Sequence, residues 1–362
     1  MFSRRNSTQI CDKSHLSARN HQLCSKNLPA RRRFDSSAFY PIHDCELTLF
    51  KKCILHIGTE KTGTTTIQAM FRENRAALAE QGFFVPKSMG GNEHIDLVSY
   101  IVNPKKKFSR RILLDLNDAK AVEEHKEKIG AKFHQELSAA ATRGDTLIIS
   151  SERLFALVTF EHEIRELRDL LMQYCESFEV VCYIRPQHEF AFSLHSTMLR
   201  KGINRPNALP DFDVPSREAR KYNYNRVLLF WERHFPSAKF TIRRFTKKHL
   251  IDGNAVHDFA NVAGIDLEPL TIPEHKNLSL GSSAQRILFA YNRFAPDNRI
   301  FDKDLNRRRL IRLLGKVLGS QGSSIPVAEQ KAFYDRYART NRMLKKRYFP
   351  DSKELFDFPF GK

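Results

Sequence analysis

The 362-residue chain lacks several features that would assign it to common classes of protein. No stretch reaches the run of about 18 apolar residues that a membrane-spanning helix needs, although peripheral contact with a membrane stays open. The six cysteines form no CxxC pair and show no metal-ligand spacing, which favours reduced thiols in a cytoplasmic protein over disulfides or a zinc site. An apolar secretory leader and any nucleic-acid-binding module are also absent, so no nucleic-acid partner is expected.

Acidic residues are scarce relative to basic ones. The chain has 41 aspartates and glutamates against 60 lysines and arginines, a formal net charge of +19. Such a balance suits anionic partners, including small ligands that carry phosphate. Residues 1–48 are basic and poor in aliphatic side chains, and we expect a disordered extension there. We expect one domain over residues 49–362, with a mainly helical C-terminal part over 266–362.

Alternating strand and helix patterns predict the fold of this domain. Apolar stretches begin at Cys53, Thr146 and Phe178, and the last ends at Ile184. Between the first two, helical spacing predicts one helix from the first turn to Gly82 and a second that begins near residue 118. The second has the apolar stripe Val122, Ile129, Phe133, Leu137 and Ala140. The expected fold is α/β: a P-loop-like, three-layer domain with a central, mostly parallel sheet flanked by helices, plus a C-terminal helical region.

Residues 53–66, CILHIGTEKTGTTT, combine a strand, a turn rich in glycine and threonine, and the start of an amphipathic helix. The first N–H groups of a helix have no intrahelical partner and its dipole favours anions, so the turn predicts an anion-binding site. Gly58, Gly63 and Thr64 nearly satisfy the nucleotide P-loop pattern, but the lysine lies inside the loop, at Lys61, instead of directly after Gly63. This displacement argues against ATP or GTP and for another phosphate-bearing donor.

The turn resembles the 5′-phosphosulfate loop of sulfotransferases that use 3′-phosphoadenosine 5′-phosphosulfate (PAPS). Glu60 stands where that family usually has proline, and Lys61-Thr62-Gly63-Thr64-Thr65 matches. A second segment is similar to the family's 3′-phosphate site, in which an arginine ends a strand and a serine follows eight residues later. Arg185 and Ser193 have this spacing. Both offer donors that suit phosphate oxygens.

The resemblance covers about residues 50–357 and implies transfer of a sulfuryl group from PAPS to a hydroxyl acceptor. Lys61 would stabilise the leaving phosphate. The residues implied in donor binding are Lys61, Thr62, Gly63, Thr64, Thr65, Thr66, Arg185 and Ser193. The glycine-rich motif of the cytosolic aryl branch is not evident, so a carbohydrate or glycolipid acceptor is expected. This scheme requires no metal, and the sequence shows no carboxylate cluster to bind one.

An acceptor hydroxyl also needs a general base within hydrogen-bond reach. Glu152 is one candidate, because it follows a predicted strand, and ligands gather at the carboxyl edge of open α/β sheets. His94, in a polar stretch after the first helix, is the second, and Glu93 is a weaker third. Glu152 could instead be a helix-start carboxylate, and His94 an ordinary loop histidine.

Two other functions stay open on the sequence. A P-loop kinase or NTPase would need a lysine directly after Gly63, which is absent, and a strand-ending aspartate for magnesium, which is not apparent. A nucleotide-binding relative that has lost the chemistry would keep both loops.

Overall fold

The computed structural model describes residues 49–91, 93–106, 108, 114–116, 118–140, 145–211, 219–273, 280–294, 305–318 and 325–356. The extension expected over residues 1–48 lies outside these ranges. In chain order the elements are β1 (Phe50–Gly58), α1 (Thr64–Glu73), α2 (Arg75–Glu80), β2 (Phe83–Phe84), α3 (Ile95–Ile101), α5 (Ala119–Ala140), β3 (Thr146–Ser150), α6 (Glu152–Leu157), α7 (Glu161–Met172), β4 (Cys175–Ile184), α8 (Gln187–Arg200), η1 (Ala219–Tyr222), α9 (Tyr224–His234), β5 (Lys239–Arg244), η2 (Ile251–Gly253), α10 (Ala255–Ala263), α11 (Ser282–Phe294), α12 (Leu305–Leu318), α13 (Val327–Asp335) and α14 (Ala338–Tyr348).

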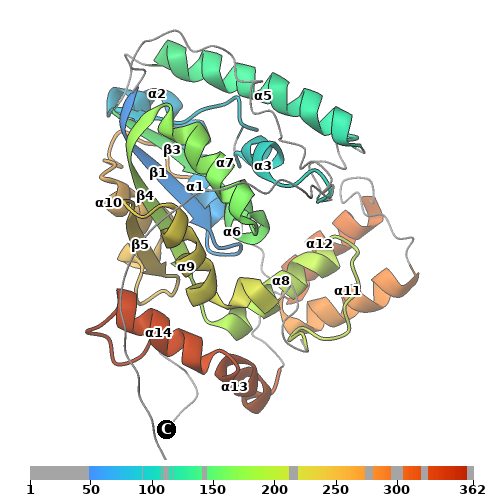
Figure 1. Ribbon diagram of the computed structural model, residues 1–362. Helices are drawn as coiled ribbons and strands as arrows, with labels where there is room; N and C mark the ends of the chain where they lie inside the picture. The colour runs from blue at the N-terminus through green and yellow to red at the C-terminus, as the bar shows by residue number, and fades with distance from the viewer. Residues whose placement is uncertain are drawn as a thin grey trace, which may run out of the picture. The chain divides into compact units, whose positions relative to one another are not determined.

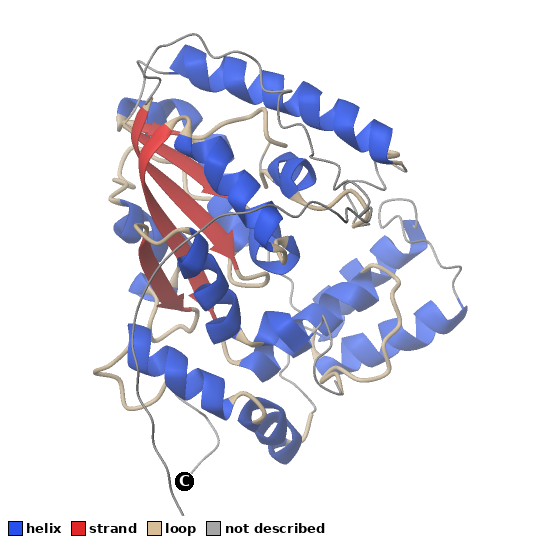
Figure 2. Cartoon of the chain, in the orientation of Figure 1, coloured by secondary structure: helices blue, strands red, loops and turns tan. Residues whose placement is uncertain are grey.

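The strands form one sheet in the order β2-β3-β1-β4-β5, and every neighbouring pair is parallel (Figures 1 and 2). The fold class is therefore α/β, as the sequence predicted. After β1 the chain builds one half of the sheet, with β2 and β3, and then returns to the other side of β1 for β4 and β5. In such sheets ligands bind at this switch point, outside the carboxyl ends of the strands.

Both faces of the sheet are covered, because side chains along each strand alternate between two apolar clusters. Leu55 of β1 and Val180 of β4 lie in the cluster that also contains buried side chains of α3, α5, α6, α7 and α9. Ile54 and Val181, the neighbouring residues, lie in the cluster formed with α1, α2 and α10. These are the outer layers that the sequence pattern predicted.

The predicted helix with the Val122-to-Ala140 stripe is confirmed as α5, and all five stripe residues are buried. The predicted strand that begins at Thr146 is confirmed as β3. The single helix predicted up to Gly82 is wrong, since α1 and α2 are separated at Asn74. The Asn74 side chain donates to the Thr271 carbonyl and accepts from the Thr271 N–H, both at 2.8 Å, contacts that no local pattern reveals.

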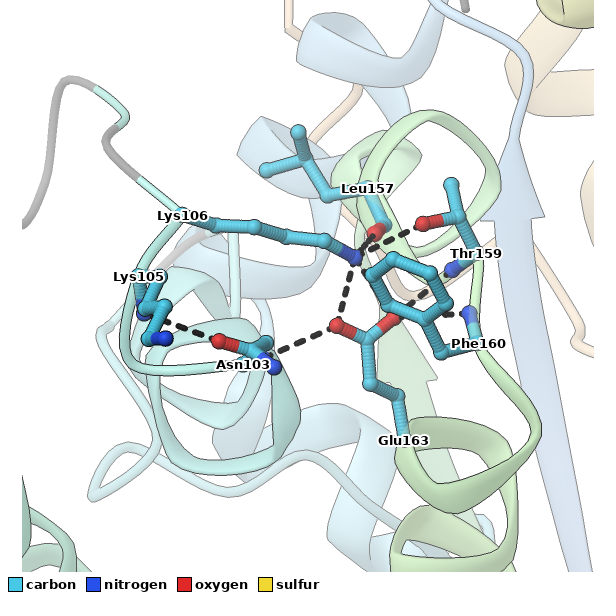
Figure 3. A network of polar contacts seen from close by, with 7 residues as sticks. All are labelled: Asn103, Lys105, Lys106, Leu157, Thr159, Phe160 and Glu163. Atoms are coloured by element: carbon cyan, nitrogen blue, oxygen red, sulfur yellow. Dashed lines mark hydrogen bonds and ion pairs between the residues drawn. The ribbon is translucent and has the colours of Figure 1, made fainter.

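A buried ion pair joins the segment after α3 to the turn between α6 and α7 (Figure 3). The Lys106 ammonium lies 2.5 Å from Oε1 of Glu163 and donates to the Leu157 carbonyl at 2.6 Å and the Thr159 hydroxyl at 2.8 Å. Glu163 also accepts from the N–H groups of Asn103, Thr159 and Phe160. Because both charges are hydrogen-bonded in full, the pair can be buried without an uncompensated charge.

Helices α11 to α14 make up the C-terminal part, and α11 and α13 pack against α8. Leu199 of α8 shares an apolar cluster with Leu288 of α11 and Leu314 of α12. Among the described helices, none combines the length and apolar character needed to cross a bilayer.

Candidate functional site

The loop between β1 and α1 is held in an unusual backbone conformation. Gly63 has φ of 78°, and a Cβ placed there would lie 2.7 Å from the Cβ of Ala255 on α10, so only glycine fits. The Thr62 hydroxyl donates to the Thr59 carbonyl at 2.7 Å, which fixes the turn. The first intrahelical bonds come from the N–H groups of Thr66 and Ile67 to Gly63, which leaves the preceding N–H groups outside the helical ladder.

Arg185 follows β4 and lies directly against this loop. Its Nη1 donates to the Lys61 carbonyl at 3.0 Å, and its Nη2 donates to Glu189 at 2.7 Å. The guanidinium also lies over the Phe245 ring, 5.8 Å from its centroid. The buried Nε of Arg185 has no hydrogen-bond partner in the described structure. The two predicted anion-binding segments are therefore in contact, and one donor of Arg185 is left for a ligand.

A cavity of about 750 Å³ opens where these segments meet. Its walls include residues that directly follow β1, β3, β4 and β5, the carboxyl edge that the fold designates as the ligand site. Its polar lining is rich in cations and hydroxyl groups, and it comprises Glu60, Lys61, Thr64, Thr65, Glu152, Arg153, Arg185, His188, Glu189, Ser193, Ser196, Thr197, Arg200, Lys201, Lys247 and Gln330. Six of these side chains are lysine or arginine and three are glutamate, so the cavity suits an anionic ligand.

Lys61, Gly63, Thr64, Thr65, Arg185 and Ser193 all line this cavity, whereas Thr62 and Thr66 do not. Both of these threonines are buried, and the hydroxyl of Thr62 is used within the loop. Burial lowers the pKa of Lys61, and the nearby Arg200 and Arg185 guanidinium groups lower it further. An anion bound in the cavity would relieve this repulsion.

Glu152 lines the same cavity at the start of α6. Gln68 of α1 donates to its carboxylate at 3.1 Å. The backbone of Glu152 packs against Gly58, where a Cβ would lie 3.0 Å from the Glu152 Cα. The close approach of β1 and α6 thus fixes the carboxylate beside the Lys61 loop.

His94 does not line the cavity, and its role as a general base stays a prediction. Its side chain is fully buried. Nδ1 accepts from the Ser150 N–H at 2.9 Å and Nε2 donates to the Pro86 carbonyl at 3.0 Å, so both ring nitrogens are occupied by backbone groups. Burial also lowers its pKa. The structure supports the reading of His94 as a packing residue of the loop before α3.

Arg153, Arg200 and Lys201 line the cavity, but the sequence reasoning missed them. Arg200 follows Ser193 by seven residues, close to two helical turns, so the periodicity of α8 could have placed it on the cavity side. Arg153 forms an ion pair with Glu60 at 2.8 Å, so Glu60 is the partner of a cavity arginine. Within the described residues, no group of three or more histidine, cysteine or carboxylate side chains could hold a metal ion.

Comparison with known proteins gives remote similarities. No protein-family model matches the chain. It is 23% identical over 207 residues to an uncharacterized protein of Archaeoglobus fulgidus, and the match covers 56% of this chain and 54% of that protein. The chain thus spans about half the length of this relative.

Two solved structures are similar to the chain. One is a sulfotransferase from Alicyclobacillus acidocaldarius, with a TM-score of 0.35, 11% identity, and coverage of 67% of this chain and 92% of that one. The other is the sulfotransferase domain of the Synechococcus PCC 7002 olefin synthase, with a TM-score of 0.32, 13% identity, and coverage of 80% and 94%. At such scores neither similarity by itself establishes an activity for this chain, and the inference of function depends on the contact between the two predicted anion-binding segments.

Proposed function

We propose that this protein is a sulfotransferase that moves a sulfuryl group from PAPS to a hydroxyl group of a carbohydrate or glycolipid acceptor. The observation that carries the proposal is the contact between the Lys61 loop and Arg185 at the wall of one cavity, with an Arg185 Nη1 to Lys61 oxygen distance of 3.0 Å. A donor with phosphate groups at both ends of an adenosine fits two adjacent anion-binding segments.

In this proposal each of the two segments binds one end of the donor. The N–H groups at the start of α1 and the Thr64 and Thr65 hydroxyls would hold the 5′-phosphosulfate, as anions are held at helix N-termini. Arg185 and Ser193 would hold the 3′-phosphate, with the unpaired Nε of Arg185 as one donor. Phe245 borders the same region and offers an apolar surface for the nucleoside.

Lys61 and Glu152 would supply the chemistry. The oxygen of the acceptor hydroxyl would form a bond to sulfur while Glu152 takes its proton. In the same step the bond between sulfur and the phosphate oxygen would break. Lys61 would stabilise the negative charge that develops on that leaving oxygen. Gln68, through its bond to the Glu152 carboxylate, would keep the base in position.

Calorimetry tests the donor assignment against the alternatives. The proposal predicts that adenosine 3′,5′-bisphosphate (PAP) binds without magnesium and more tightly than ATP. A preference for ATP that depends on magnesium would instead support a kinase or NTPase. Transfer of radiolabel from PAPS to a panel of hydroxylated acceptors then separates an active enzyme from a binding protein without activity.

We predict that Glu152→Gln lowers kcat by about 100-fold, at the low end of the effect of losing a general base. We expect the loss of kcat to stay at this low end because a second carboxylate could accept the proton in place of Glu152. This carboxylate is Glu93, which lies close enough to Glu152 for the two to interact electrostatically. Desolvation, and then the charge of Glu152, raises the pKa of Glu93. The measurement is the pH dependence of kcat for Glu152→Gln, with Glu93→Gln as the matched control. Wild-type kcat in Glu152→Gln would assign the base elsewhere.

A further inference from the structure

Two cationic side chains at the end of α8 line the cavity but have no part in the donor site proposed above. Arg200 is the last residue of α8, and Lys201 is its C-cap. Within the described residues, neither side chain forms an ion pair, and the buried Nε of Arg200 has no hydrogen-bond partner. The Arg200 guanidinium thus has a buried donor that a ligand could use, and the Lys201 ammonium forms no direct ion pair in the described part of the chain.

Arg200 and Lys201 share the lining of one cavity with Lys61 and with Glu152, the proposed base. Arg200 and Arg185 both act on the Lys61 ammonium. Lys201 interacts with Arg153 and with the carboxylates of Glu60, Glu93 and Glu152, the group that includes the proposed base. Lys201 therefore lies near Glu152, where an acceptor hydroxyl would bind.

The burial of these cations favours the binding of an anion. Burial lowers the pKa of Arg200 and is the leading cause of the lowered pKa of Lys201. The Arg200 guanidinium is partly buried and its Nε has no hydrogen-bond partner in the described structure, so a bound anion would offset the cost of burying that charge. Cations at the C-terminal end of a helix also complement its dipole, which helps to hold the charges of Arg200 and Lys201 there and does not depend on a bound ligand.

The C-terminal helices hold the end of α8 in place. Asn292 of α11 donates to the Leu199 carbonyl at 2.8 Å and accepts from Nε of Arg307, a residue of α12, at 3.1 Å. The Arg307 guanidinium packs on Gly202, where a Cβ would lie 2.8 Å from it. Arg200 and Lys201 thus lie on a helix end that is already held in place. This favours binding, because little conformational entropy is lost when a ligand binds to them.

We propose that the acceptor carries an anionic group beside the hydroxyl that is sulfated, and that Arg200 and Lys201 bind this group. This inference rests on the proposed function and narrows it from hydroxylated molecules in general to anionic ones, such as sugars with a carboxylate or a sulfate ester. A guanidinium and an ammonium both bind such oxyanions through charge-assisted hydrogen bonds.

Three matched acceptors test the inference: a glucuronic acid oligosaccharide, the glucose oligosaccharide of the same linkage and length, and that glucose oligosaccharide with a sulfate ester. At saturating PAPS, we expect kcat/KM to favour at least one charged acceptor over the neutral one by about tenfold or more. Arg200→Gln and Lys201→Gln should each reduce this preference several-fold. Lys120→Gln, which removes a charge on α5 that is 87% exposed, should leave it unchanged.

Calorimetric titration of the same oligosaccharides into the free and the PAP-saturated protein gives the preference without turnover. Absence of PAP binding or of transfer would contradict the proposed function, whereas equal binding of charged and neutral oligosaccharides would overturn only this inference. A preference that survives in the Arg200→Gln, Lys201→Gln double variant would overturn it as well. The carboxylate and sulfate arms show which oxyanion the site accepts.

Discussion

Replacing Lys61 by methionine is expected to lower kcat for sulfuryl transfer by about 100- to 1000-fold, the typical effect of removing a group that stabilises developing charge. Methionine keeps most of the length of the side chain, so the change removes the ammonium without opening a large gap. Lys61 lines the cavity where the two predicted anion-binding segments meet, close to Arg200 and Arg185. Initial-rate kinetics with PAPS and a competent acceptor measure the loss, and wild-type kcat would contradict this role.

The pH dependence of the rate separates the charge of Lys61 from its packing. Burial, and then the neighbouring arginines, lowers the pKa of Lys61. The side chain therefore loses its charge at a lower pH than an ordinary lysine does. The value of kcat/KM for PAPS should fall as pH rises through this lowered pKa. In Lys61→Arg the guanidinium keeps its charge, so the alkaline fall should disappear or move to higher pH. Identical alkaline limbs in the two enzymes would assign the fall to another group.

The second large effect concerns stability: Lys106→Met is expected to lower the free energy of unfolding by about 3–5 kcal/mol. The change leaves the Glu163 carboxylate buried without its cation, among the groups shown in Figure 3. Lys331→Met is the matched control, because Lys331 pairs with Asp335 at 2.5 Å and the two side chains are 59% and 48% exposed. Its cost should be about 0–1 kcal/mol. Urea denaturation measures both variants, and equal costs would contradict the account of the buried pair.

The pH dependence of stability follows from the same pair. Burial alone would raise the pKa of Glu163, but hydrogen bonds from the Asn103 N–H, Lys106 and the Thr159 and Phe160 N–H groups bring it below its usual value. A lowered carboxyl pKa contributes stability that is fully present above the ordinary glutamate pKa and is lost as pH falls through the lowered value. The double variant Lys106→Met, Glu163→Gln should recover part of the stability lost in Lys106→Met, because it removes the unpaired charge.

The local pattern of apolar residues in the sequence was enough to predict much of the fold. The strands at Thr146 and Phe178 were predictable because parallel strands buried on both faces are continuously apolar. The α5 stripe was predictable because one face of the helix is buried. The break at Asn74 was not, since its partner Thr271 is 197 residues away in the chain.

The candidate site was predictable in part for the same physical reason. Lys61 lies in the loop after β1 and Arg185 directly follows β4, and parallel strands bring their carboxyl ends to one edge. Their roles in donor binding stay predictions. The enclosure of His94 was not predictable, because it depends on tertiary contacts of its ring with Ser150 and Pro86.

The most direct measurement compares the affinities of PAP and adenosine 5′-monophosphate, which differ only by the 3′-phosphate, for wild-type, Arg185→Gln and Lys61→Met proteins. Calorimetry should show PAP binding about 10- to 100-fold tighter than the monophosphate in the wild type, as expected for hydrogen bonds to a charged group. Arg185→Gln should abolish this difference, and Lys61→Met should weaken both ligands while the difference is kept. If Arg185→Gln leaves the ratio of the two affinities unchanged, the two segments do not hold opposite ends of one nucleotide.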